Sequence, residues 1–276
     1  MKLLIYIFIF SFNLFPIGFD ALTIPSNSMK MSLSGSGVAS RNAVGINPSA
    51  NENISSTIGF SANKWIVDIS GSSFYYTNNG YHFNYYSIGV DDIEVRNEIA
   101  SDEPLDVIGA NFFSFNFSKS FTTFTNLNFG FGAQINYNQI FIDKFSTITF
   151  DFGIQKLIIN NFQLGLAVKN LGKSDHDLPT NYSLGTSYYM PKTKTELLID
   201  YEYSSFYRGG INLGVIQNIK FLTLNFGYSK FSNLRSTLSS GIKVTLNKKY
   251  NFLYSILSIE DTNLGFAHYF GIELSL

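Results

Sequence analysis

The chain of 276 residues contains no cysteine. This excludes disulfide bonds, thiolate metal ligands, a cysteine nucleophile and the lipidated cysteine of a bacterial lipoprotein. Charged residues are also scarce, at 14% against roughly 25% in an ordinary soluble domain. The formal net charge of −1 offers no basic surface of the kind that nucleic-acid binding needs, so we expect no nucleic-acid partner.

Long apolar runs are missing after the N-terminal region. No later segment has about 18 consecutive apolar residues, so the sequence predicts no further transmembrane helix. Aromatic residues are abundant instead, with 28 Phe and 17 Tyr making up most of an aromatic content of 17%. Low charge, many aromatics and a mean hydropathy near zero are typical of strands that alternate between lipid and a polar interior.

The N-terminus has the pattern of an export signal. Lys2 precedes an apolar run from Leu3 to Ile17 that is short for a membrane-spanning helix. We predict a signal peptide over residues 1–20, with cleavage near Gly18 or Ala21. A retained membrane anchor is the alternative.

The mature chain is dominated by alternation with a period of two. In "LNFGFGAQINYNQI" (127–140), Phe129, Phe131 and Ile135 alternate with small or polar residues such as Gln134 and Asn136. Similar runs separated by turn residues predict about fourteen strands between residues 53 and 276. The predicted strands are 53–62, 64–76, 79–89, 110–120, 125–138, 145–156, 161–170, 180–190, 194–203, 207–217, 221–230, 235–246, 250–257 and 264–276.

The polar face and the connections distinguish a barrel from a soluble sandwich. The polar positions are mostly Asn, Ser, Thr, Gly and Gln, which suits a hydrogen-bonded lumen, whereas a solvated sheet face is usually richer in Lys and Glu. Tight links such as 77–80 and 247–250 alternate with longer ones such as 90–109 and 170–180. Outer-membrane barrels sort their connections in this way. The sequence therefore predicts an all-β fold, a transmembrane antiparallel barrel in outer-membrane lipid.

The C-terminal strand ends at the last residue, with Phe270, Ile272, Leu274 and Leu276 in alternation. Such a strand resembles the signal read by the outer-membrane assembly machinery, which is therefore an expected partner.

Residues 21–52 differ from the rest because they are rich in Gly, Ser and Asn. This segment resembles the N-terminal part of the PorV/PorQ family, a branch of the FadL-like fourteen-stranded barrels. Its matching residues are Gly35, Gly37, Val38 and Ala39, followed by Asn47, Pro48 and Ser49, where Ser49 replaces the family's Ala.

Three further segments match the family in the same order. "FSANKWIVDIS" (60–70) resembles the entry to the second strand, centred on Trp65 and Asp68. "DDIEVRNE" (91–98) resembles the following loop. "GLAVKNLG" (165–172), with "LPTNYSLGTSYYM" (178–190), resembles a later strand, corner and strand.

The resemblance implies a barrel in the bacterial outer membrane whose N-terminal segment, residues 21–52, folds into the lumen as a small plug. Some relatives assist type IX secretion, so secreted cargo proteins or secretion-system subunits are implied partners. FadL-like relatives take up hydrophobic molecules instead. The matching motifs are structural and do not choose between the two roles.

The sequence offers little for catalysis or cofactors. His176 lies between Asp175 and Asp177 in a long loop, but adjacent loop residues do not orient an imidazole as a triad requires. The acidic residues of 91–94 lack the spacing and glycine of an EF-hand loop. We therefore expect no enzyme activity, no metal and no cofactor, with a barrel hydrolase as the weakest alternative.

Inward-facing charges suggest how the plug is held. Charged groups at membrane depth need to face the interior and find partners. We expect Arg41 of the plug to form ion pairs with carboxylates of the barrel wall. The candidates are Asp151, Glu196, Asp200 and Glu202, beside inward Lys169, Lys243 and Glu273.

The sequence thus favours a non-enzymatic outer-membrane barrel of PorV/PorQ type that assists protein secretion or surface attachment. A FadL-like channel for hydrophobic small molecules is the alternative.

Overall fold

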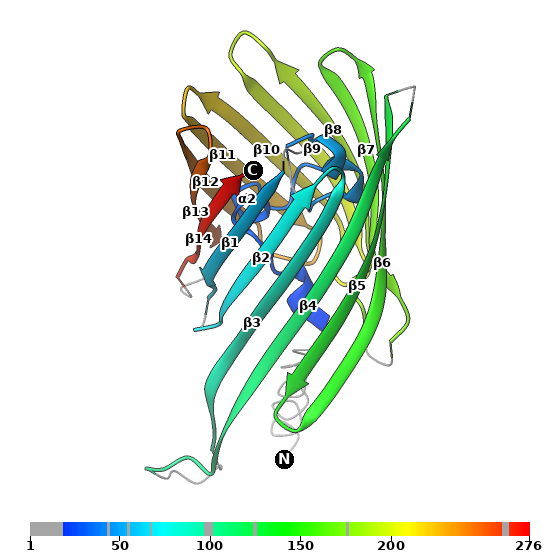
Figure 1. The fold of residues 1–276 in the computed structure, drawn as a ribbon. Coiled ribbons are helices and arrows are strands. Elements are labelled where there is room, and N and C mark those ends of the chain that lie inside the picture. The colour runs from blue at the N-terminus through cyan, green and yellow to red at the C-terminus, as the bar shows by residue number, and fades with distance from the viewer. Residues whose placement is uncertain are drawn as a thin grey trace.

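The chain folds into a closed barrel of fourteen antiparallel strands around a small N-terminal plug (Figure 1). The computed structural model describes residues 19–42, 45–53, 56–66, 68–96, 102–123, 126–174, 177–260 and 265–276. The predicted signal peptide lies almost wholly outside these residues. No helix within them is long and apolar enough to cross a membrane.

Every strand pairs with its neighbours in sequence, and β1 closes the ring by pairing with β14. Closure joins the first strand to the last, so the ring of the barrel has no open edge. The strands are β1 (Thr57–Lys64), β2 (Ser70–Asn78), β3 (Tyr81–Val95), β4 (Asp106–Thr122), β5 (Leu127–Ile140), β6 (Asp143–Ile159), β7 (Phe162–Gly172), β8 (Asn181–Met190), β9 (Thr195–Ser204), β10 (Arg208–Ile219), β11 (Leu222–Phe231), β12 (Thr237–Leu246), β13 (Tyr250–Ile259) and β14 (Ala267–Ser275).

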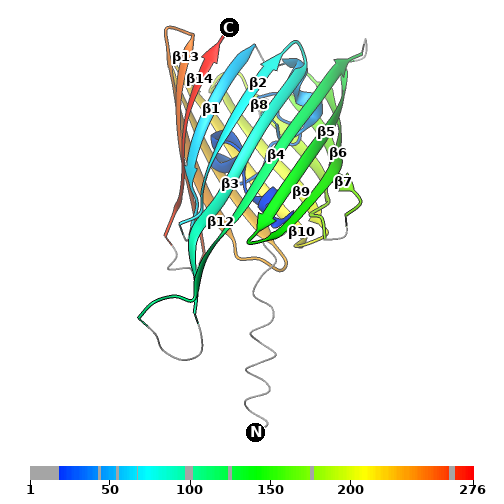
Figure 2. The same cartoon turned by 60° about the horizontal axis from the view of Figure 1, so that its bottom comes forward.

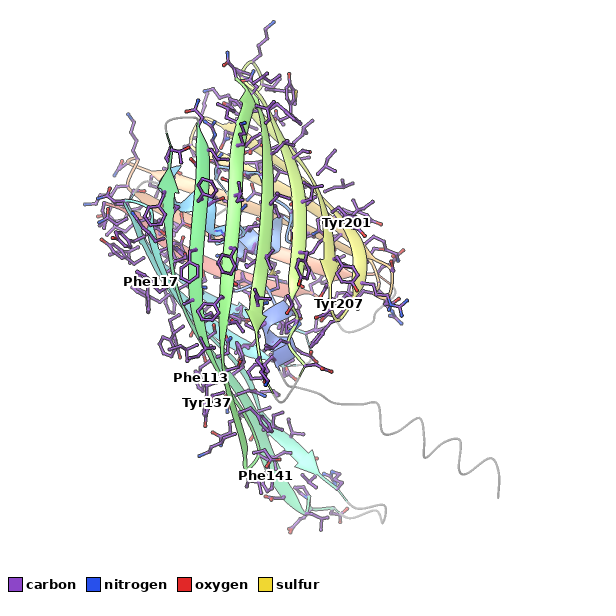
Figure 3. The ribbon with its side chains drawn as sticks, turned by 90° about the vertical axis from the view of Figure 1, so that its right-hand side faces the viewer. Phe113, Phe117, Tyr137, Phe141, Tyr201 and Tyr207 are labelled. Carbon is purple, nitrogen blue, oxygen red and sulfur yellow. The ribbon has the colours of Figure 1, made fainter. Side chains whose placement is uncertain are left out.

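The predicted alternation is confirmed clearly in strands such as β5, β6 and β9. In β5, the outward-facing Phe131 and Ile135 are 44% and 57% exposed, whereas the inward-facing Asn136 is fully buried. Phe117 and Tyr201 stand on the outer surface with other aromatic side chains (Figure 3). Exposed apolar side chains extend around the whole barrel, far beyond the patches that soluble monomers tolerate. The outer face is therefore the lipid-facing one.

The connections differ between the two ends of the barrel. At one end, which we call the short-turn end, all connections between strands have two to four residues. The opposite, long-loop end holds connections of up to ten residues, although β5 and β6 are joined there by only two. Strands β3 to β6 also project at this end (Figures 1 and 2). Beyond Gly89 strand β3 has no partner in β2, and before Thr149 strand β6 has none in β7.

The plug runs through the lumen from the long-loop end to the short-turn end. It contains the 3-10 turn η2 (Phe19–Thr23), the short helix α2 (Ser28–Ser32) and the 3-10 turn η3 (Pro48–Asn53). Asn27 caps α2 because its side-chain oxygen accepts the N–H of Lys30 at 2.9 Å. The blue segment inside the barrel in Figure 1 is this plug.

One local prediction is wrong. Trp65 and Asp68 were expected in the second strand, but β1 continues to Lys64 and β2 begins only at Ser70. Both residues therefore lie in the β1–β2 connection at the long-loop end. Asp68 has a φ of 58°, a left-handed conformation that ends a strand rather than continuing it.

Candidate functional site

A belt of inward-facing glycines supports the plug. A Cβ at Gly165 would overlap the backbone of Val38, and one at Gly227 would overlap the backbone of Leu33. Only glycine therefore allows the plug backbone to lie directly against the wall at these points. The belt consists of Gly130 in β5, Gly153 in β6, Gly165 in β7, Gly185 in β8, Gly214 in β10, Gly227 in β11 and Gly241 in β12.

Asp200 of β9 holds the turn that follows α2. Its Oδ2 accepts the backbone N–H groups of Gly37 at 2.5 Å and Val38 at 3.0 Å. The residues before this turn end the helix, with Gly35 at a φ of 79° and its N–H bonded to the carbonyl of Lys30. Two of the motif glycines, Gly35 and Gly37, thus shape the segment that docks on Asp200.

Asn47 joins the two halves of the plug to each other and to the wall. Its side chain is fully buried, and its Nδ2 donates to the carbonyls of Val38 at 2.8 Å and Leu166 at 3.1 Å. Its Oδ1 accepts from both the N–H and the hydroxyl of Ser49. The next residue, Pro48, begins η3 and rests on Gly130. The Asn-Pro-Ser element is therefore a packing motif of the plug.

The expected ion pairs of Arg41 are not formed among the described residues. Its Nε donates to the neutral Gln163 at 2.7 Å. Glu196 still contacts the plug, because its carboxylate accepts from the amide of Asn42 at 3.1 Å.

The other two carboxylates bond to the wall rather than to the plug. Asp151 accepts from the N–H of Asn170 at 2.8 Å, and Glu202 accepts from Asn212 at 3.2 Å. Amide and backbone donors lie beside these carboxylates, and no ion pair with its desolvation cost is formed inside the lumen among the described residues.

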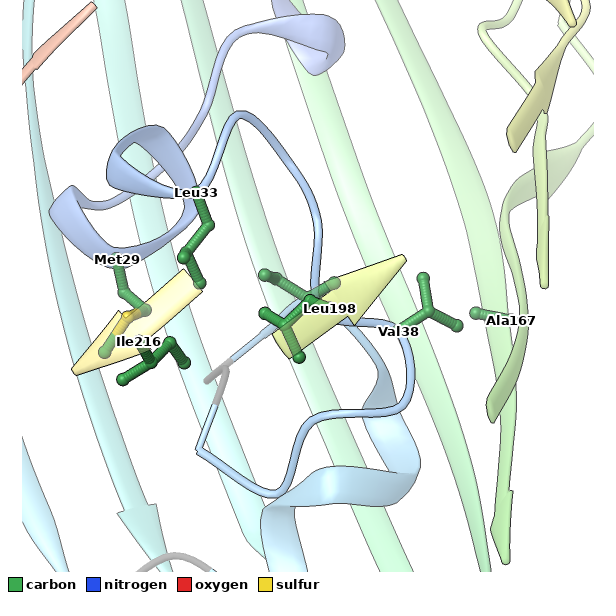
Figure 4. Packing of buried hydrophobic residues seen from close by; sticks show 7 residues of the cluster. Met29, Leu33, Val38, Ala167, Leu198 and Ile216 are labelled. Atoms are coloured by element: carbon green, nitrogen blue, oxygen red, sulfur yellow. The ribbon is translucent and has the colours of Figure 1, made fainter. Parts of the chain in front are cut away.

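Apolar packing adds to these bonds. Met29, Leu33 and Val38 of the plug form a buried cluster with Ala167, Leu198 and Ile216 of the wall (Figure 4). A second cluster lies at the long-loop end, where Phe19 and Ala21 pack against Tyr86, Ile88 and Phe112. We call this second cluster the apolar cap. Its wall residues break the rule that the inner face is polar.

Cavities between the plug and the wall include three that are lined by described residues. The central cavity, of about 90 Å³, is lined by polar residues of β3 to β8 and by Lys30. The short-turn cavity, of about 310 Å³, borders Tyr75, Lys243 and Glu273. The long-loop cavity, of about 340 Å³, lies beside the apolar cap and shares Leu22, Ile24, Lys30, Lys169 and Asn181 with the central cavity.

The long-loop cavity has an apolar part and a polar part. Trp65, the only tryptophan of the chain, lines it from the β1–β2 connection. The other large apolar lining residues are Leu22, Ile24, Val38, Ile46, Phe231, Leu234, Leu257 and Ile259. Its polar lining residues include Lys30 of the plug, together with Lys169, Asn181, Glu202 and Asn212 of the barrel. We call these five residues the polar wall of the cavity.

Burial shapes the charge of the polar wall. It lowers the pKa of Lys30 well below its usual value, and the nearby Lys169 lowers it further, while Asp151 acts in the opposite direction. Lys30 Nζ donates to Ser26 Oγ at 3.1 Å, and Lys169 Nζ donates to the carbonyl of Gly45 at 3.2 Å. The amine of Lys30 is thus bonded within the plug, and the amine of Lys169 joins strand β7 to the plug.

The described histidines do not form a catalytic arrangement. His82 Nδ1 is 2.8 Å from Thr77 Oγ1, and His268 Nδ1 is 2.8 Å from the hydroxyl of Tyr254. His176 and Asp175 lie outside the described residues. Within those residues, no three His, Asp or Glu side chains are grouped closely enough to hold a metal ion.

Sequence reasoning missed the cavity and the glycine belt. Gly153 and Gly185 look like ordinary small inward residues when strands are inspected singly. Their alignment appears only in the register, where Gly130 faces Gly153 and Gly165 faces Gly185. The signal in the sequence was one inward glycine in most consecutive strands.

Solved structures with a similar fold share little sequence with this chain. The CymD monoaromatic hydrocarbon channel superposes with a TM-score of 0.69 at 8% identity, covering 92% of this chain and 98% of that one. The Ralstonia pickettii toluene transporter TbuX gives 0.67 at 10% identity, with 91% and 98% covered. A Pseudomonas aeruginosa FadL homologue gives 0.60 at 11% identity, with 91% and 96% covered.

No protein-family model matches the sequence, and no curated protein does. At such low identity the structural likeness establishes the fold alone: this chain is a closed fourteen-stranded barrel with a fold similar to that of these channels.

Proposed function

We propose that this protein is a bacterial outer-membrane channel that takes up small hydrophobic molecules through its lumen. The observation that carries the proposal is the long-loop cavity. It is a mostly apolar space of about 340 Å³ at one end of the plugged barrel. Ligand pockets for small molecules have volumes of about 300–1,000 Å³ and mostly apolar walls. Barrels with this fold include a monoaromatic hydrocarbon channel and toluene transporters, which supports the same substrate class.

The orientation of the barrel fits uptake. Outer-membrane barrels place short turns in the periplasm and longer loops outside the cell. The long-loop cavity then faces the exterior, and the short-turn cavity faces the periplasm. The plug lies between them and separates the two compartments in this conformation.

Fluorescence of Trp65 tests the proposal directly, because no other tryptophan contributes to the signal. The purified barrel in detergent micelles, which add no tryptophan of a scaffold protein, is titrated with toluene. We expect a saturable change in Trp65 emission that the substitution Ser183→Leu, which fills part of the cavity, weakens. Ser187→Leu, two inward positions along β8 and outside this lining, is the matched control. A non-saturable change, or equal titrations for all three proteins, contradicts the proposal.

A role in type IX secretion is the second candidate function, and the projecting part of strands β3 to β6 favours it. This projection exposes apolar residues at its tip, with Leu105, Val107 and Ile142 at 64%, 49% and 73% exposure. The unpaired edges of β3 and β6 offer backbone groups to an extended segment of a secreted protein. Deleting residues 91–106 should abolish cargo capture and spare toluene binding if this role holds.

A further inference from the structure

The short-turn cavity differs from the long-loop cavity in its chemistry. Its volume of about 310 Å³ is in the range of small-molecule pockets, but its lining is polar apart from Met29, Ile216 and Leu253. Among the described residues that line it, only Lys243 and Glu273 are charged. The described lining therefore carries one positive and one negative group and has no net charge.

The two charged side chains enter the cavity from different strands. Lys243 of β12 pairs with Leu253 of β13, which pairs with Gly271 of β14, and Glu273 lies two residues further along β14. Two strand spacings and two residues therefore separate their Cα atoms, which is roughly 12 Å. Both side chains are half-buried and line the cavity, so both are accessible from it.

The two charges do not neutralise each other. No ion pair joins Lys243 to Glu273 or to another described residue, and its amine makes no hydrogen bond within the described part of the chain. Glu273 instead accepts the hydroxyl of Tyr75, whose ring lies over Gly59 of the intervening strand β1. This bond holds the carboxylate in place and leaves it further acceptor positions.

A neutral donor lies between the two charges. Asn251 of β13 pairs with Glu273, and it lies two residues from Leu253, the partner of Lys243. Its Oδ1 accepts the hydroxyl of Thr245 at 2.7 Å. Its Nδ2 bonds to no described residue and is not enclosed, so it keeps N–H groups for a ligand.

This arrangement discriminates between classes of ligand. A ligand with only an amine pairs with Glu273 and is repelled by Lys243, and a ligand with only a carboxylate meets the reverse. A hydrocarbon displaces water from polar groups and gives them no partner in return. A small molecule with both an ammonium and a carboxylate can pair with both side chains through charge-assisted hydrogen bonds.

We propose that the short-turn cavity binds small zwitterions of the α-amino acid type, with the ammonium at Glu273 and the carboxylate at Lys243. The apolar residues Met29, Ile216 and Leu253 of the lining then face the side chain of the ligand. This inference goes beyond the proposed function, because it concerns a different cavity on the other side of the plug.

Three probes of similar shape test the inference. Leucine carries both charges, 3-methylbutylamine lacks the carboxylate, and 4-methylpentanoate lacks the ammonium. Their Kd values are measured at neutral pH by saturation-transfer NMR on the full barrel in non-ionic micelles, with empty micelles as the blank. We expect leucine to bind about tenfold more tightly than either analogue, since each analogue lacks one charge-assisted hydrogen bond.

Two variants assign the ends of the ligand. Glu273→Gln keeps an acceptor for Tyr75 but removes the negative charge, so leucine should bind about tenfold more weakly and 4-methylpentanoate no more weakly. Lys243→Gln should weaken leucine to a similar extent and leave 3-methylbutylamine no weaker. Lys220→Gln, at an exposed lysine between β10 and β11 at the same end, is the control and should change none of the three Kd values. Heat-dependent gel mobility verifies that each variant forms a barrel.

Binding of either analogue to the unmodified protein as tightly as leucine overturns the inference, and this comparison needs no variant. An unchanged Kd for leucine in both Glu273→Gln and Lys243→Gln also overturns it. The toluene titration followed by Trp65 reports the long-loop cavity, so saturable toluene binding without leucine binding overturns this inference and leaves the proposed function standing.

Discussion

The substitution Asp200→Ala should release the middle of the plug. It removes the acceptor of two backbone N–H groups, those of Gly37 and Val38, in a site where Asp200 is 1% exposed. Hydrogen bonds to charged groups contribute roughly 1.5–3 kcal/mol each, and the two N–H groups stay buried without a partner. We therefore expect about 4 kcal/mol less free energy of docking for this segment. That corresponds to about a thousandfold larger population of the undocked state.

The assay is limited proteolysis of the barrel in nanodiscs, with cleavage within residues 33–42 located by mass spectrometry. Faster cleavage in Asp200→Ala should accompany a larger single-channel conductance, because a displaced plug opens the lumen. Asp200→Asn keeps one oxygen acceptor and should have an intermediate effect. Asp143→Ala, at an exposed acidic residue of β6, is the control. Cleavage and conductance equal to those of the unmodified protein in Asp200→Ala would refute the role of Asp200.

Three further predictions concern the wall, the lipid face and the apolar cap. Gly165→Val places a side chain against Val38 and should cost about 1–3 kcal/mol by overpacking, seen as faster proteolysis of the plug with an intact barrel; unchanged proteolysis would contradict the glycine belt. Phe131→Lys puts a charge on the lipid face and should reduce stability by about 2–4 kcal/mol in urea unfolding from bilayers, and a neutral effect would mean that Phe131 does not face lipid. Burial raises the pKa of Asp20, and the Asp177 carboxylate raises it further. Since the folded pKa exceeds the unfolded one, the packing of η2 is most stable at acidic pH and weakens as pH rises through the folded pKa. Hydrogen exchange of residues 19–24 should therefore be slower at about pH 4 than at neutral pH after correction for intrinsic rates, and Asp20→Asn should remove the difference; the same difference in that variant would assign it to another group.

The barrel was predictable because each strand carries the alternation on its own. Phe131 and Gln134 differ in character whichever strands lie beside them, and closure follows from the need to pair every strand in lipid. Alternation of this kind can be recognised within a single segment of the sequence. The plug was predictable only through the resemblance of residues 21–52 to a known family, because their composition sets them apart without showing where they lie.

The contacts between plug and wall were not predictable, because they depend on register. The sequence placed Arg41 and several carboxylates on facing surfaces, and opposite charges suggested ion pairs. The structure places neutral Gln163 beside Arg41 and backbone N–H groups beside Asp200. Those nearest donors are fixed by how the strands align and where the plug turns.

The long-loop cavity depends on both the plug and the connections. Trp65 was assigned to a strand, where it would have faced either lipid or the lumen. It lies instead in the β1–β2 connection and lines the cavity with Leu22 and Leu257, which are far apart in sequence. Inward apolar residues such as Ile88, Phe112 and Leu257 were a sequence signal of an apolar region inside the barrel.

The central claim is that small hydrophobic molecules enter through the long-loop cavity, and uptake of labelled toluene measures it most directly. Gram-negative cells with this protein in their outer membrane are compared with cells that carry Ser183→Leu at equal abundance and with cells that lack the protein. The account predicts uptake faster than in cells without the protein, and a return towards their rate in Ser183→Leu. Equal uptake by all three would contradict it.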